Sequence, residues 1–186
     1  MSMLWWLLPA LLVFWSVGAY NRLVRLRGAA LRAYTALHTV MVRQSELLQS
    51  ALPVEPNGAQ TVAGELMDGA ALAWRGLRAA LQQFNALLVA TRNRALEPEA
   101  LAALATARGV LSMAWARVQQ EGQDLAGAPV PATLLARWED LAREGELARA
   151  QFNEAVSDYN RAIRQFPAVL LAAVAGFRRA RKLEQR

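Results

Sequence analysis

The feature that most limits how this chain can fold is its start, because residues 1–21 carry no charged side chain. Within them, residues 3–20 read MLWWLLPALLVFWSVGAY. As an α-helix rising about 1.5 Å per residue, this segment is about 27 Å long, close to the ~30 Å hydrocarbon core of a bilayer. Aromatic residues stand near both ends, as at membrane interfaces: Trp5, Trp6, Trp15 and Tyr20. We therefore expect residues 1–20 to form a transmembrane anchor.

Two other interpretations of this start fit less well. A secretory signal peptide needs a basic residue before its apolar run, which is absent here, and Ser16-Val17-Gly18 is a weak cleavage site. A buried core helix would be striped, whereas this segment is apolar all round. The arginines that follow it, Arg22, Arg25 and Arg27, predict by the positive-inside rule that the N-terminus lies outside and the remainder in the cytoplasm.

The net charge of +6 is concentrated at the two ends of the chain. Residues 33–177 hold 12 arginines against 14 acidic residues, so the body is mildly acidic. A nucleic-acid-binding domain would more often carry its basic face along the body. A second basic cluster closes the chain, with Arg178, Arg179, Arg181, Lys182 and Arg186. Basic residues beside apolar segments favour contact with anionic lipid headgroups, so we expect a lipid partner and no nucleic acid.

Prolines and glycines divide the chain into four long segments that we expect to be helices: 3–50, 59–94, 97–125 and 132–166. Each has an apolar stripe at alternating spacings of three and four, and none alternates like a strand. The most regular stripe is Leu134, Trp138, Leu141, Gly145, Ala148, Phe152, Ala155, Tyr159, Ala162 and Phe166. The predicted fold is all-α: a transmembrane helix continuing into an antiparallel up-down-up-down four-helix bundle over residues 21–166. Arg108 falls on the third stripe, where its charged head could extend to solvent or pair with an acidic residue of the bundle such as Glu144 or Asp158.

The remaining tail, residues 167–186, is apolar and then basic. Residues 167–177 read PAVLLAAVAGF, about 16 Å as a helix and too short to cross a bilayer. Two placements stay open. The segment could rest on the membrane surface with its arginines on phosphates, or it could cap the open end of the bundle.

Two motifs flank the long middle of the chain. The first, Tyr20-Asn21-Arg22-Leu23-Val24-Arg25-Leu26-Arg27, directly follows the expected anchor. The second, Phe152-Asn153-x-x-Val156-x-x-Tyr159-Asn160-x-x-Ile163-x-x-Phe166-Pro167, ends the last long helix, with Arg149 three residues before it and Gly176-Phe177 beyond. In order and spacing, both resemble the motifs of the LemA family of bacterial proteins, although Phe152 stands where that family usually has Tyr.

The resemblance implies a membrane-anchored helical bundle in the bacterial cytoplasmic membrane, and it supplies no reaction. Asn153 and Asn160 lie seven residues apart, each directly after an aromatic residue of the stripe. They could fix the register between helices, as asparagines do in coiled coils. Alternatively, they could form a polar surface that docks a partner.

We find no constellation typical of an enzyme. Cysteine is absent and His38 is the single histidine, which excludes a Cys–His zinc site. The close carboxylates Glu97/Glu99, Glu139/Asp140 and Glu144/Glu146 look like helix starts or solvated faces. We therefore expect no catalytic, cofactor or metal site, and a scaffold that binds another membrane-associated protein. Whether it also binds a second copy of itself stays open. A modulator of envelope lipid or membrane shape is the alternative, and an enzyme ranks third.

Overall fold

The computed structural model of the chain describes residues 3–53, 69–121, 130–166, 168–177 and 179–183, with side chains from residue 14 onward except 171 and 173–175. Five helices lie in these ranges: α1 (Met3–Ala51), α2 (Gly69–Thr91), α3 (Pro98–Glu121), α4 (Ala132–Ile163) and α5 (Ala168–Ala175). The described residues contain no strand, which confirms the all-α prediction. Residues 59–68 and 122–125, which we expected to be helical, lie outside the described residues.

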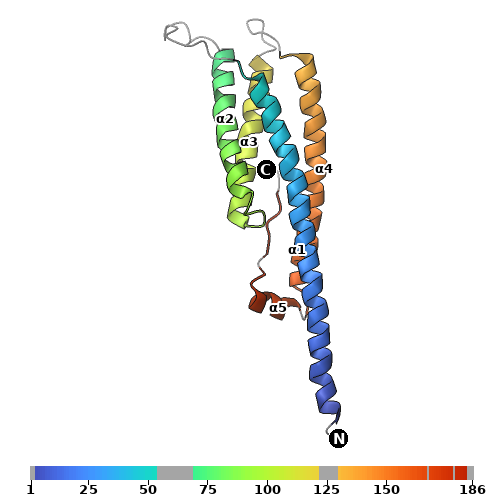
Figure 1. Cartoon of the computed structure of the whole chain (residues 1–186). Coiled ribbons are helices and arrows are strands. Elements are labelled where there is room, and N and C mark those ends of the chain that lie inside the picture. The colour runs from blue at the N-terminus through green and yellow to red at the C-terminus, as the bar shows by residue number, and fades with distance from the viewer. Residues whose placement is uncertain (1–2, 54–68, 122–129, 167, 178, 184–186) are drawn as a thin grey trace.

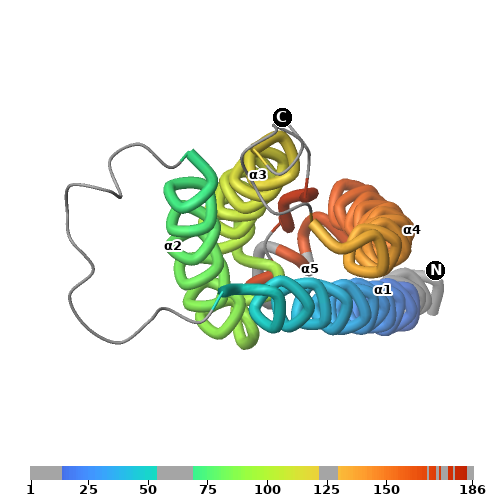
Figure 2. The backbone as a smooth tube through the Cα atoms, turned by 90° about the horizontal axis from the view of Figure 1, so that it is seen from above, coloured from blue at the N-terminus to red at the C-terminus, as the bar shows by residue number. Residues whose placement is uncertain are grey.

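The four long helices pack as two pairs (Figure 1). α1 runs along α4, α2 runs along α3, and the two pairs meet mainly between α1 and α2. α3 and α4 make few backbone approaches, and long side chains bridge them, as where Trp115 contacts Trp138 with ring centroids 5.6 Å apart. Seen from above, the C-terminal segment lies between the α3 and α4 sides of the bundle (Figure 2).

The predicted stripes form most of the core. In α3, Leu101, Leu104, Leu111, Trp115 and Val118 are buried as expected. In α1 the buried surface is wider than one stripe: Tyr34, Met41 and Leu48 are buried beside Leu37 and Val40. This helix contacts both α4 and α2, so a single stripe of seven-residue period underestimates the width of its buried surface.

The prediction that the last long helix continues to Phe166 was wrong. α4 ends at Ile163, and the chain turns there, with the backbone N–H groups of Arg164 and Gln165 donating to Arg161 and Ala162. Phe166 is consequently 60% exposed rather than part of the core. The turn directs the chain into α5, which lies across the end of the α1–α4 pair (Figure 1).

The N-terminal part of α1 extends past the rest of the molecule (Figure 1). Within the described residues, no helix is both long enough and apolar enough to cross a bilayer. Residues 1–2 and the side chains of residues 3–13, including Trp5 and Trp6, belong to the expected anchor and lie outside the description.

A glycine allows the close approach of α1 and α4. A β-carbon on Gly145 would lie 3.0 Å from Gln44 Nε2 and 3.7 Å from Val40 Cγ1. The Gln44 amide occupies that position because it donates to the Leu141 carbonyl at 2.9 Å. Gly145 thus permits a side-chain-to-backbone hydrogen bond between the paired helices.

We expect Gly145→Leu to lower the free energy of unfolding by about 1–3 kcal/mol, because the added side chain overpacks the α1–α4 contact. Gly109→Leu is the matched control. It lies on an exposed face of α3 with nothing within 4 Å of an added β-carbon, and should stabilise the helix by about 0.5 kcal/mol. Urea unfolding followed by circular dichroism measures both. Equal effects at the two glycines would contradict the assigned α1–α4 contact.

Candidate functional site

The C-terminal segment reverses direction at the end of α5. Gly176 has a φ of 71°, and the Phe177 amide donates to the Ala172 carbonyl at 3.0 Å. A left-handed glycine followed by this six-to-one hydrogen bond is a Schellman motif, which ends a helix and redirects the chain. Residues 179–183 then run back along the bundle beside α4 (Figures 1 and 2).

Two asparagines of α4 hold the backbone of this returning segment. Asn160 accepts a hydrogen bond from the Ala180 amide (3.0 Å) and donates to the Ala180 carbonyl (2.7 Å). Asn153 does the same for Leu183, at 2.8 Å and 3.1 Å. Each side-chain amide therefore pairs with both polar groups of one residue, as a neighbouring strand would. We call Asn153 and Asn160 the asparagine clamp.

The spacing of the clamp matches the spacing of its ligand. Seven residues along a helix span about 10.5 Å, and three residues of extended chain span about 10 Å. Ala180 is 6% and Leu183 is 1% exposed, whereas Arg179, Arg181 and Lys182 are exposed. The clamped residues thus face the bundle with a period of three, the periodicity of a polyproline II helix rather than of a strand.

A charged network borders the leucine end of the clamp. Glu146 lies between two arginines: Arg108 Nη2 donates to it at 2.8 Å, and Arg149 Nε donates at 3.1 Å. Arg149 also reaches the Leu183 carbonyl at 3.4 Å. Partial burial works to raise the pKa of Glu146, but hydrogen bonds from Arg149 and Arg108 and their charges outweigh it, so its pKa is lowered. The carboxylate is therefore ionised at neutral pH and holds Arg149 against the segment.

Arg108 pairs with an acidic residue of the bundle, as predicted, but that residue is Glu146 rather than Glu144 or Asp158. Glu144 instead forms an ion pair with Arg43 of α1, and Asp158 pairs with Arg161 one turn later on α4. Glu146 lies two residues beyond Glu144, which on a helix rotates its side chain from the α1 side toward α3.

The structure brings the two sequence motifs together at one end of the α1–α4 pair. Tyr20 and Phe177 rings contact edge to face at 6.0 Å, and the Arg27 guanidinium lies 5.9 Å from the centre of the Phe177 ring. Arg22 donates to Gln165 at 3.0 Å, and Leu23 is fully buried. Asn21, Val24 and Arg25 are exposed. Phe152 is buried against Tyr34, which supports its role as a packing residue.

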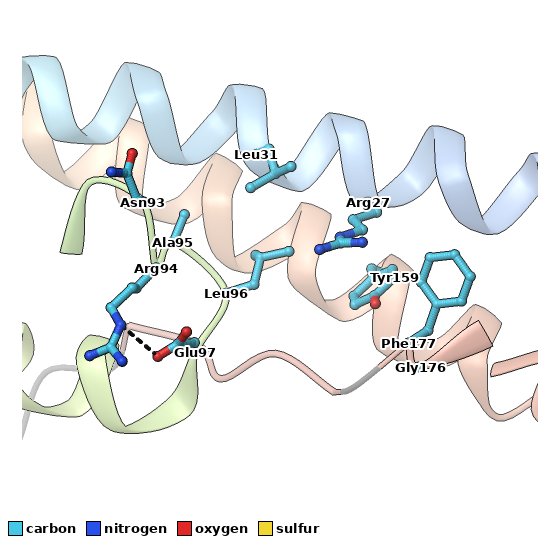
Figure 3. Close-up of a pocket in the computed structure, with 10 residues that line it drawn as sticks. All are labelled: Arg27, Leu31, Asn93, Arg94, Ala95, Leu96, Glu97, Tyr159, Gly176 and Phe177. Atoms are coloured by element: carbon cyan, nitrogen blue, oxygen red, sulfur yellow. Dashed lines mark ion pairs between the residues drawn. The ribbon is translucent and has the colours of Figure 1, made fainter. Parts of the chain in front are cut away.

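A cavity of about 230 Å³ opens beside this junction (Figure 3). Arg27 and Leu31 of α1, Tyr159 of α4, the turn between α2 and α3, and Phe177 line it. Burial raises the pKa of Tyr159, and the charge of Arg27 opposes that effect. The cavity is thus closed on one side by the chain segment that leads into the clamp.

Of the two placements left open for the tail, the structure shows part of α5 packed on the bundle and part of it exposed. Ala168 and Ala172 of α5 are buried against the bundle, as a cap would be, while Val169 and Leu170 are exposed. The basic residues Arg179 and Arg181 flank the clamped Ala180, with their side chains in solvent. Pro167 and Arg178 lie outside the described residues.

Most of the residues considered for catalysis have structural partners, including Glu144 and Glu146. His38 Nε2 lies 3.2 Å from the Leu88 carbonyl, Glu97 pairs with Arg94, and Asp140 pairs with Arg143. In the described part of the chain, no group of His, Asp and Glu residues could hold a metal ion. The asparagine clamp makes four hydrogen bonds, and they go to a chain segment rather than to another helix.

The fold and this site define a class: an α-helical bundle protein whose last long helix grips an extended peptide segment. A model of the LemA family matches residues 76–185, which include α3, α4, the clamp and its ligand. This chain belongs to the LemA family. The first motif, Tyr20–Arg27, precedes the matched range. Neither the search of curated proteins nor that of solved structures found a match.

Sequence reasoning identified Asn153 and Asn160 as notable but did not find their ligand. The signal was available in the spacing, because seven helical residues match three extended residues. Ala180 and Leu183 have that separation, yet the turn at Gly176 that returns them to α4 has no strong sequence signature. Arg149 was named from the resemblance, and the structure places it at the Leu183 carbonyl.

We expect Asn153→Ala to accelerate hydrogen exchange at the Leu183 amide, and Asn160→Ala at the Ala180 amide, each by roughly tenfold. Each change removes the acceptor of that amide and a hydrogen bond to the same residue's carbonyl, together about 1–2 kcal/mol. Exchange monitored by NMR resolves the two positions. Ser157→Ala, one turn away with a hydroxyl bonded to the Asn153 carbonyl of its own helix, should leave both amides protected.

Proposed function

We propose that this LemA family protein is a membrane-anchored, non-enzymatic helical interaction protein. Residues 1–20 insert in the bacterial cytoplasmic membrane with the N-terminus outside, and the bundle faces the cytoplasm. Its partners are the lipid bilayer and another membrane-associated protein. The bundle serves as a rigid support that presents the asparagine clamp and the surfaces beside it.

The continuity of α1 is the observation that carries this proposal. One unbroken helix, Met3–Ala51, links the apolar start of the chain to the core of the bundle. Where its described side chains begin, large apolar residues are exposed to a degree unusual outside an interface: Phe14 (79%), Trp15 (48%), Val17 (53%) and Tyr20 (45%).

The neighbouring surface has the same character. The exposed side chains of Phe166, Val169 and Leu170 lie at the end of the bundle from which α1 extends, and Trp15 contacts Phe166 with ring centroids 5.3 Å apart. Arg22 and Arg25 are exposed just beyond the apolar residues of α1. An apolar surface followed by arginines suits the boundary between acyl chains and phosphates.

The alternative, a lipid modulator acting through the tail, has less support. That role needs the apolar tail residues to enter the lipid. Val169 and Leu170 are exposed, but four other apolar residues of the tail are buried within the protein: Ala168, Ala172, Ala180 and Leu183.

Membrane extraction at alkaline pH tests the anchor. The full chain should stay in the membrane pellet after a carbonate wash, whereas the variant with Leu8→Arg and Leu12→Arg should be released. Each arginine near the middle of a spanning helix costs about 2.5–3.5 kcal/mol. Val89→Arg with Leu147→Arg, at exposed positions of α2 and α4, is the matched control and should remain in the pellet. Release of the unsubstituted chain by carbonate would refute membrane anchoring.

Single cysteines test the orientation, since the chain has none of its own. A membrane-impermeant maleimide added to intact cells should label Ser2→Cys and leave Ser112→Cys unlabelled until the cells are lysed. Ser112 is exposed on α3, so only the membrane would protect it. Labelling of Ser112→Cys in intact cells would place the bundle outside.

A further inference from the structure

The asparagine clamp binds backbone groups, so it could bind a peptide segment other than the one it holds within its own chain. Four hydrogen bonds join Asn153 and Asn160 to the amide and carbonyl groups of residues 180 and 183. None of them depends on which side chains the clamped residues carry. The side-chain requirement is a small residue at the first position and a leucine three residues later, because those two are buried while the intervening residues are exposed.

We propose that the clamp is a peptide-binding site that the C-terminal segment of a second copy of this chain enters, in exchange for the segment bound within one copy. The inference rests on the proposed interaction role and names its partner. A second copy carries the segment already shown to fit: Ala180, Leu183 and the exposed basic residues beside them. It also offers a vacated clamp in return, so the exchange closes as a two-fold symmetric pair.

The connection to the clamped segment is built so that the segment can leave. α5 has eight residues; its Val169 and Leu170 are exposed, and its buried residues Ala168 and Ala172 are small. Gly176, in the left-handed region, is the point at which the direction of the following chain is set. The segment contributes no helix to the bundle, and the four long helices contact one another mainly within the α1–α4 and α2–α3 pairs.

Binding of a segment to the clamp of its own copy competes strongly with binding to the clamp of a second copy. The reason is that a tethered ligand acts at an effective concentration of roughly millimolar. A test must therefore remove the internal competitor. Two full-chain variants do this in complementary ways. Asn153→Ala with Asn160→Ala leaves an intact segment without a clamp, and alanine preserves the helix. Leu183→Asp leaves an intact clamp without a segment that fits, because it places a charge where a leucine is buried.

Both variants also carry Ser112→Cys, labelled with a fluorescence donor on one and an acceptor on the other, and are mixed in detergent. We expect energy transfer in the mixture with an apparent Kd at least tenfold lower than for either variant mixed with itself. Replacing Leu183→Asp by Lys182→Asp, which changes an exposed neighbour and keeps the internal segment bound, should abolish that advantage. Circular dichroism of each variant checks that the helices are retained.

A synthetic peptide with the sequence of residues 178–186 tests whether the clamp accepts a free peptide as well as a second copy of the chain. It should bind the Leu183→Asp chain and not the double asparagine variant. If the peptide binds but the full-length partner variant does not, the clamp accepts a foreign peptide and the second-copy proposal is overturned. If neither binds, the clamp is an internal fastening alone. Both measurements are made in detergent, so their failure leaves the membrane-anchor test unaffected.

Discussion

The antiparallel contact between α1 and α4 is the constraint on which the rest of the molecule depends. Gln44 reaches the Leu141 carbonyl, Tyr34 packs on Phe152, and Arg22 reaches Gln165. As the α1 residue number falls, the α4 number rises by nearly the same amount, so the register is kept along the pair. This register brings the first motif, at the base of α1, to the end of the second motif on α4.

A second consequence concerns the C-terminal segment. An extended backbone beside a helical core has no neighbouring strand, and its buried amides and carbonyls would remain without partners at a cost of about 1–3 kcal/mol each. Asn153 and Asn160 supply the missing partners from the helix surface. Because α3 and α4 approach each other mainly through long side chains, the bundle has room for a segment between them.

The sequence was informative wherever local chemistry decides the structure. Apolar periodicity predicted the helices and most buried positions of α3, and the prolines placed the start of α3 at Pro98 and of α4 just after Pro131. It failed where partners come from distant parts of the chain. Arg108 pairs with Glu146, whereas Glu144 pairs with Arg43 of α1. Helix α4 ends before Phe166, where the chain turns into α5. The anchor itself stays a prediction.

The clamp and the expected membrane end are linked physically. Phe177, which precedes the clamped segment, packs on Tyr20, the last residue of the expected anchor, and lies under Arg27, seven residues further along α1. The same ring borders the cavity that Tyr159 lines from α4, one residue before Asn160 (Figure 3). Phe177 therefore connects the clamped segment both to Tyr20 and to the wall of the cavity. Through this one ring, the segment that α4 binds is packed against the base of α1.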